Sequence, residues 1–188
     1  MTLLRNLLAL VGLLAVVAVL WVAWTFRGFD PQAPRVYWDM ARSLAATGNA
    51  AEATVWKAKV APGLTFAEVD QSIQSTAQAD NIKDVGQLPL GDQVAAMMGK
   101  PWRKLKIYLY CNPLTAAKMV DYSDAYSAYL PCRVALLQDK SGQLWLYSLN
   151  MDMMIHGGKP LPPDLRKEAE HVRKVILDIM HKSATGDF

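Results

Sequence analysis

Apolar residues fill one unbroken stretch near the start of the chain and then recur at regular intervals along the rest. Residues Leu7 to Phe26 form twenty positions without a charged side chain. At a rise of about 1.5 Å per residue, such a helix is about 30 Å long, which matches the hydrocarbon core of a bilayer. The pattern therefore predicts a membrane-spanning helix, followed by elements in which apolar and polar positions alternate.

Both ends of this stretch carry side chains that suit a bilayer surface. Trp21 and Trp24 gather at its C-terminal end, and Arg5 and Arg27 flank it. Indole rings favour the headgroup level, and an arginine can extend its charge toward water. These four residues are predicted to lie at the membrane interface, so the lipid bilayer is the first expected partner.

A cleaved signal peptide and a buried core helix are the two alternatives for this stretch. A signal peptide has a shorter apolar segment of about 7–15 residues, followed by small residues at its cleavage site. Here the apolar residues continue past Ala18, and tryptophans stand where small residues are needed. A terminal helix that is apolar all round is also not typical of a soluble core. We therefore expect an uncleaved, single-pass signal-anchor.

The orientation of the anchor depends on the basic residues beside it. Arg5 and the N-terminal amine lie on one side, whereas Arg27 and two further arginines lie on the other, mixed with acidic residues. The arginine count alone favours a cytoplasmic domain. Because the acidic residues and the amine offset that count, we expect the opposite arrangement, with the domain on the periplasmic side of a bacterial inner membrane.

Hydrophobic spacing after the anchor predicts an amphipathic helix and then alternating strands and helices. Apolar residues recur at intervals of three and four over residues 31–47, and Gly48 ends that helix. The further expected elements are a strand at 54–60, a helix at 65–79, a strand at 82–88, a helix at 92–98, a strand at 105–111, a short helix from 113, strands at 133–138 and 144–149, and a helix at 165–181.

This order indicates an α+β fold, a two-layer sandwich of a mostly antiparallel sheet and helices, preceded by the transmembrane helix and the amphipathic helix. The turn at Asp139 to Gly142 joins the last two strands as a hairpin. The predicted division of the chain is a transmembrane anchor at 1–28, an amphipathic connecting helix at 29–50, a compact α+β domain at 51–183 and a tail at 184–188.

Three short motifs, taken in order, resemble the domain of unknown function 302 family. They are a strand that ends in Asn112-Pro113, a Leu130-Pro131 step before an apolar strand, and an acidic turn from Asp139 to Gly142 followed by Trp145. The resemblance covers about residues 53–181. It implies a compact two-layer α/β fold that is often dimeric, and it carries no settled activity.

Two cysteines depart from the pattern of that family and form the first candidate site. Cys111 ends one predicted strand and Cys132 starts another. If these strands are antiparallel neighbours, both residues lie at the same end of the sheet, where Cα atoms about 4.4–6.8 Å apart permit a disulfide. A disulfide, two buried free thiols, and a metal or redox pair all remain open at this stage.

A cluster of methionines and a histidine forms the second candidate site. Met151, Met153 and His156 follow the strand at 144–149. Thioether and imidazole ligands suit Cu(I), and Met with His can bind haem iron axially. Methionines also fill irregular core gaps. Because no second ligand cluster supports a metal, we expect no cofactor, with copper or haem as the alternative.

Composition narrows the functional classes further. With 20 Lys and Arg against 17 Asp and Glu, the formal net charge is +3, so the chain lacks the basic field of a nucleic-acid-binding protein. Hydrophobic residues at 52% exclude general disorder, and two cysteines cannot build a disulfide-rich scaffold. No nucleophile elbow or phosphate-binding loop is present in the sequence, and we expect no enzymatic activity.

The expected function is therefore that of a membrane-anchored, non-enzymatic accessory or interaction protein. An integral membrane protein or a second copy of the chain is the expected partner, and a respiratory or other electron-transfer complex is a natural setting. Two alternatives remain. One is a metal- or haem-binding redox module that uses the Met/His cluster and the cysteines, and the other is a small-molecule or lipid-binding domain.

Overall fold

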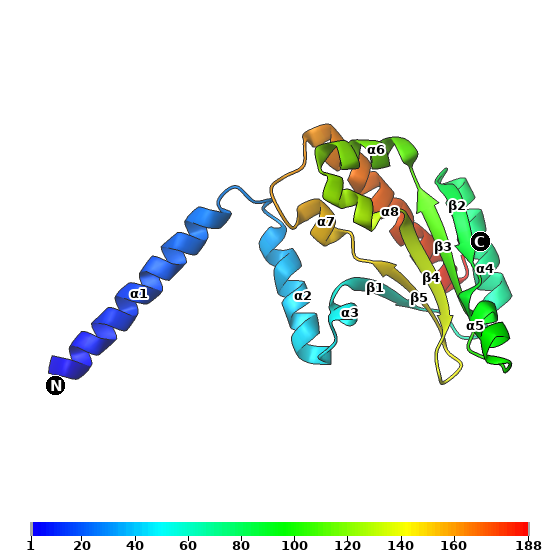
Figure 1. The fold of residues 1–188 in the computed structure, drawn as a ribbon, viewed down its shortest axis with the longest axis horizontal. Coiled ribbons are helices and arrows are strands. Elements are labelled where there is room, and N and C mark those ends of the chain that lie inside the picture. The colour runs from blue at the N-terminus through cyan, green and yellow to red at the C-terminus, as the bar shows by residue number, and fades with distance from the viewer. Residues whose placement is uncertain (1, 188) are drawn as a thin grey trace.

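One five-stranded sheet forms the centre of the domain in a computed structural model that describes residues 2–187 (Figure 1). The strands lie side by side in the order β1-β5-β4-β3-β2, and each pairs with its neighbours in antiparallel orientation. The prediction of an α+β, two-layer fold is confirmed. The strands are β1 (Val55–Lys59), β2 (Lys83–Leu88), β3 (Leu105–Cys111), β4 (Cys132–Gln138) and β5 (Leu144–Leu149).

The helices include each of those expected from the sequence and three short ones that were not expected. The expected helices are α1 (Thr2–Phe26), α2 (Ala33–Thr47), α4 (Phe66–Ala79), α5 (Leu90–Met98), α6 (Pro113–Tyr122) and α8 (Pro163–Thr185). The unexpected ones are α3 (Ala50–Ala53), the 3-10 helix η1 (Asp124–Tyr129) and α7 (Asp152–His156). Each of these three spans at most six residues, which is too short for a hydrophobic period to show.

The two faces of the sheet have different surroundings because strand side chains alternate between them. Tyr108, Leu136 and Leu146 lie on the first face and are fully buried. The long helices α4 and α8 lie side by side against that face and close the core (Figure 1). The side chains of the second face remain partly or fully exposed to solvent.

Local sequence signals account for the two covering helices. Thr65 accepts a hydrogen bond from the Glu68 N–H, and the Glu68 carboxylate accepts one from the Thr65 N–H at 2.7 Å, so the predicted capping box starts α4. In α8 an apolar stripe faces the core, and its residues Ile176 and Ile179 are fully buried. The sequence therefore specifies both the start of α4 and the buried side of α8.

The predicted tail at 184–188 begins too early. α8 continues to Thr185, Ala184 is buried, and the Ala184 carbonyl accepts a hydrogen bond of 2.7 Å from the Ala61 N–H. Gly186 then ends the helix in the left-handed conformation. The helix is longer than predicted because a non-local backbone contact holds its last turn against the domain. Phe188 lies outside the described residues.

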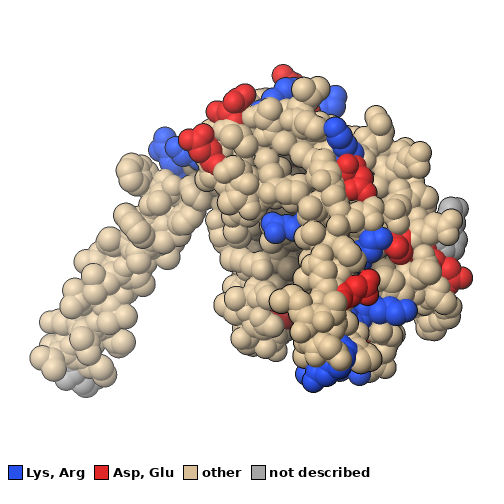
Figure 2. Space-filling view, turned by 45° about the vertical axis from the view of Figure 1, so that its right-hand side comes forward, with Lys and Arg blue, Asp and Glu red and all other residues tan. Residues whose placement is uncertain are grey.

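The helix α1 projects from the domain as a separate rod (Figure 1). None of its residues is buried, and it is long and apolar enough to cross a membrane, a property that a signal sequence near the N-terminus shares. In the space-filling view, the visible side of the rod carries no acidic or basic residue, and such residues begin at the junction with the domain (Figure 2).

The edge strand β2 has an irregular backbone. Its pairing with β3 shifts register between Asp84 and Gly86, which forms a β-bulge. Gly86 has a φ of 155°, and the Gly86 N–H donates a hydrogen bond of 2.9 Å to Asp84 Oδ1. The bulge bends the strand and interrupts its regular outer edge.

Replacement of Gly91 by alanine is expected to destabilise the domain. A Cβ atom at Gly91 would lie 2.6 Å from both the Arg103 carbonyl oxygen and the Leu105 nitrogen, and backbone cannot move aside as a flexible side chain can. The free energy of unfolding should fall by about 1–3 kcal/mol, as is typical of overpacking. Thermal or denaturant melting of the full chain in mild detergent measures the change. The control is Gly158→Ala, because no atom lies within 4 Å of its added Cβ.

Candidate functional site

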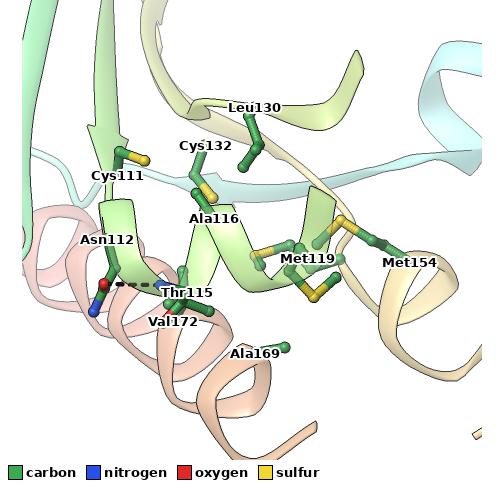
Figure 3. A pocket seen from close by; sticks show the side chains of 11 residues that line it. Cys111, Asn112, Thr115, Ala116, Met119, Leu130, Cys132, Met154, Ala169 and Val172 are labelled. Atoms are coloured by element: carbon green, nitrogen blue, oxygen red, sulfur yellow. Dashed lines mark hydrogen bonds between the residues drawn. The ribbon is translucent and has the colours of Figure 1, made fainter. Parts of the chain in front are cut away.

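A small apolar pocket lies at one end of the sheet, where β3 ends and β4 begins (Figure 3). Helices α6, α7 and α8 complete its wall, and Ala169 and Val172 of α8 line it. Its volume is about 30 Å³, enough for a water-sized occupant. The pocket is therefore a small, partly open space lined mainly by apolar atoms.

Five sulfur-containing residues line this pocket. Both predicted cysteines are among them, together with three methionines (Figure 3). Met119 and Met151 are only 3% and 5% exposed, and Met154 and Cys132 pack against the core cluster. The sulfur residues are Cys111, Met119, Cys132, Met151 and Met154.

Strand register and helix starts explain why these residues meet. Tyr110 pairs with Cys132 across β3 and β4, so Cys111 and Cys132 lie at the same end of the sheet. Asn112 then accepts a hydrogen bond of 3.2 Å from the Thr115 N–H, and with Pro113 it starts α6, which brings Met119 to the pocket. The motif Asn-Pro thus acts as a helix start beside the cysteines.

The helix α7 brings the other two methionines to the pocket. An ion pair of 2.5 Å between Arg173 of α8 and Asp152 holds the first turn of α7 against the domain. Met151, just before α7, and Met154, within it, then reach the pocket.

Both thiols are free in the structure. Burial, together with the nearby Cys111 thiol, raises the pKa of Cys132 to about 11, although the charge of Arg133 partly offsets the rise. Burial also raises the pKa of Cys111, although Lys83 partly offsets that effect. Without a bound cation, both cysteines are therefore neutral thiols at neutral pH.

The predicted Met/His cluster does not converge on one site. Met151 enters the sulfur-lined pocket, whereas Met153 lines a separate hollow beside Met40 of α2 and Leu149 of β5. His156 is turned away from both, toward the start of α2. Two pocket methionines, Met119 and Met154, were not singled out from the sequence. Met119 lies on α6, of which only the start was predicted. Met154 follows Met153 directly in the sequence, but the two side chains line different pockets.

His156 instead belongs to a buried polar cluster around Asp30, which is 1% exposed. Asp30 Oδ2 lies 3.4 Å from His156 Nδ1 and 3.4 Å from Arg166 Nη1. The Asp30 N–H donates a hydrogen bond of 2.8 Å to the carbonyl of Gly158, and the Gln32 N–H donates one of 2.8 Å to Asp30 Oδ1. These contacts join the segment that follows α1 to α7 and α8, and we call them the Asp30 junction.

The electrostatics of the Asp30 junction favour the carboxylate form. Burial alone raises the pKa of Asp30, but the hydrogen bonds from Gln32 and His156 and the charge of Arg166 outweigh it, so the pKa lies below its ordinary value. A second contact supports the junction, since the Tyr37 hydroxyl donates a hydrogen bond of 2.6 Å to the Gly157 carbonyl.

A second polar cluster lies at the other end of the sheet. Asp70 of α4 accepts hydrogen bonds from Tyr108 at 2.7 Å and from Lys106 at 2.8 Å. Burial, followed by the hydrogen bond to Asp70, raises the pKa of Tyr108 above its ordinary value. Because Asp70 is paired with Lys106 and accepts a hydrogen bond from Tyr108, this cluster fixes α4 on the sheet.

The second face of the sheet is a broad apolar surface. The strand positions that alternate with the buried ones carry ten apolar side chains, each at least partly exposed. They are Val55, Leu88, Leu105, Ile107, Leu109, Ala135, Leu137, Trp145, Tyr147 and Leu149. We call this set the open sheet face.

Comparison with known proteins identifies a matching family model and a solved structure with a similar fold. The family model of a domain of unknown function, DUF302, matches residues 57–183. The crystal structure of an uncharacterized conserved DUF302 protein from Bacillus stearothermophilus is similar, with 16% identity and a TM-score of 0.54, and the match covers 69% of this chain and 98% of that chain. At this identity the likeness concerns the fold alone. No curated protein matches the chain.

Replacement of Asp30 by asparagine is expected to weaken the Asp30 junction. Above about pH 4 the variant should lose about 1–3 kcal/mol of unfolding free energy, because His156 and Arg166 lose a buried charged partner. The folded-state pKa of Asp30 is lowered, so its contribution is complete above the unfolded pKa and is lost as the pH falls through the folded value. The difference between wild type and variant should therefore shrink in acid, as measured by melting from pH 7 to pH 2.5.

The matched control for this prediction is Asp39→Asn. Asp39 forms an exposed pair of 3.7 Å with Arg35, in which both side chains are more than half exposed, so its loss should change stability by at most about 0.5 kcal/mol. Equal melting of the two variants at neutral pH would contradict a stabilising role for the Asp30 junction.

Proposed function

The chain belongs to the DUF302 family, and from this premise we propose that it is a membrane-tethered accessory protein that acts by binding rather than by catalysis. In this proposal α1 stays in the bilayer and the domain binds a larger membrane complex through the open sheet face. The observation that carries the proposal is that a separate apolar rod and an uncovered apolar sheet face occur in one small chain.

The dimensions and ends of α1 support a permanent anchor. Its 25 residues give a length of about 37 Å at the usual helical rise, enough to cross the hydrocarbon core of about 30 Å. Arg5, Trp21, Trp24 and Arg27 lie near its two ends. The next helix, α2, exposes 68% of Trp38, and an indole ring in that position suits the headgroup level. The proposed topology keeps the N-terminus inside and the domain outside.

The composition of the open sheet face supports a protein partner. Trp145, Tyr147 and Ile107 offer large apolar contact areas, and aromatic residues are enriched in protein interfaces. The sheet already presents these side chains on a rigid surface, so little conformational entropy is lost when a partner covers it.

The charges around the open sheet face favour a different chain over a second copy. Lys59, Lys83 and Arg133 occupy exposed strand positions on this face, whereas no strand position on it carries a carboxylate. Two copies facing each other would bring like charges together, which is unfavourable. We therefore propose a membrane-protein partner with an apolar centre and an acidic rim.

Reversal of the basic charges on the open sheet face is expected to release the chain from its complex. In mildly solubilised membranes, the wild type should comigrate with a larger species on native gels. The double variant Lys59→Glu and Arg133→Glu should weaken that association by about tenfold or more, because its acidic side chains would meet the acidic rim. Both side chains are exposed, so the melting temperature should stay close to that of the wild type.

The control for charge reversal is Lys167→Glu, an exposed lysine on α8, the helix that covers the opposite face. It should leave the association unchanged. Migration of the wild type as a lone monomer would overturn the accessory role, and a complex that contains only copies of this chain would overturn the choice of a different partner.

A permanent anchor predicts that the mature chain keeps its first residues. Membranes washed with alkaline carbonate should retain the protein, because about thirty ångströms of apolar helix holds it in the lipid. Mass spectrometry of the mature N-terminus should find a chain that begins at Met1 or Thr2. A soluble product that starts beyond Ala18 would show instead that α1 is a cleaved signal sequence.

A further inference from the structure

The donor atoms of the sulfur-lined pocket are of one chemical kind. Its two nearby polar side chains are already engaged, since the Asn112 amide oxygen accepts from Thr115 and the Thr115 hydroxyl donates to Glu168 at 3.2 Å. The atoms left to bind an occupant are the Cys132 thiol and three thioethers, with the Cys111 thiol at the margin, because the strand register places Cys111 beside Lys83 on the opposite face of the sheet. Such soft ligands prefer soft monovalent cations, above all Cu(I).

The sulfur-lined pocket does not offer the ligands that Zn²⁺, Mg²⁺ or Ca²⁺ require. Within residues 2–187, no group of three or more His, Cys, Asp or Glu side chains is arranged to hold a metal ion. Structural Zn²⁺ needs four ligands of the thiolate, imidazole or carboxylate type, and Mg²⁺ and Ca²⁺ need oxygen. Two cysteines with methionines meet none of these requirements.

The charge of a Cu(I) complex suits the low polarity of the pocket. One thiolate from Cys132 and one Cu(I) ion sum to zero, and thioethers from methionines add no charge. A neutral complex avoids the large penalty that an apolar environment places on an isolated ion. Since Met119 and Met151 are almost fully buried, their thioethers lie where such a complex would be shielded from water.

The volume of the pocket suits a single ion and is too small for an organic cofactor. A volume of about 30 Å³ holds one ion, whereas pockets for organic ligands span about 300–1,000 Å³. Haem therefore has no room here, and of the three residues first considered as copper or haem ligands, Met151, Met153 and His156, only Met151 lines the pocket.

We propose that the sulfur-lined pocket binds one Cu(I) ion through the thiolate of Cys132 and the thioethers of Met119, Met151 and Met154, with Cys111 as a second thiol at the margin. On binding, a copper–sulfur bond replaces the S–H bond of Cys132, and its proton passes to solvent; no electron is transferred. This site is independent of the proposed membrane partner, because it lies at the end of the sheet.

Competition for Cu(I) tests the site in the full chain. The protein in mild detergent, under reducing and anaerobic conditions, is titrated against a coloured Cu(I) chelator of known affinity. The wild type should withdraw one Cu(I) per chain, and X-ray absorption should find only sulfur around the copper. Ag(I), which favours the same ligands, should compete for the site.

Two variants probe the two ligand types. Cys132→Ser removes the thiolate, and the triple change Met119→Leu, Met151→Leu and Met154→Leu removes the thioethers while nearly conserving core volume. Loss of even an outer-shell partner weakens metal binding by about 10–100-fold, so each variant should lose at least about tenfold in Cu(I) affinity. The control is Met153→Leu, a methionine outside the pocket, which should bind as the wild type does.

Three results would overturn the site. They are failure of the wild type to compete for Cu(I), binding by the triple methionine variant with unchanged affinity, and nitrogen or oxygen as the main copper ligand. Melting curves of the copper-free variants show that each is folded before titration. If Cys132→Ser does not fold, the triple variant still decides, because leucine replaces methionine with little change in packing.

Discussion

The packing of α8 against the sheet is the interaction on which the other features depend. Ile176 and Ile179 are fully buried, and burial of each such side chain contributes about 1.5–3 kcal/mol relative to exposure. The same helix lines the sulfur pocket with Ala169 and Val172 and directs Arg166 toward Asp30. One helix therefore closes the core, supports the pocket and receives the segment that follows α1.

The core, the open sheet face, the sulfur-lined pocket and the Asp70 cluster occupy different parts of the domain. The first face of the sheet is sealed by α4 and α8, and the second presents the open sheet face. The sulfur pocket lies at one end of the sheet, and the Asp70 cluster lies at the other. Because these regions do not overlap, a partner on the open sheet face would leave the pocket accessible only from the end of the sheet. The proposed partner surface and the proposed Cu(I) site could therefore be occupied at the same time.

Long periodic segments made most of the fold predictable from sequence. β3 and β5 have the predicted bounds, and α4 begins at the predicted capping box, since alternation and capping are local signals. The start of α6 was predicted correctly at Pro113, but its length was not predicted. The short elements α3, η1 and α7 contain too few residues for a period, and their positions depend on tertiary contacts.

The candidate site was only partly predictable for the same reason. Strand order placed Cys111 and Cys132 at one end of the sheet, which the register bears out. The partner of His156, by contrast, is Asp30, which lies 126 residues earlier in the chain. No local pattern indicates such a pairing, because it arises only when α7 and α8 fold back onto the segment after α1. Met119 was not predicted as a pocket residue for the same reason, because it reaches the pocket only once α6 has formed and packed beside the sheet.

The bulge in β2 has a consequence for how this chain can associate. An exposed edge strand with a regular backbone invites a neighbouring chain to add its own strand and so to polymerise. The shifted register at Gly86 and the charges of Lys83 and Asp84 remove that template from one border, and Lys57 and Lys59 place charge along the other. Growth of the sheet sideways into fibres is thereby discouraged, even where many copies crowd together.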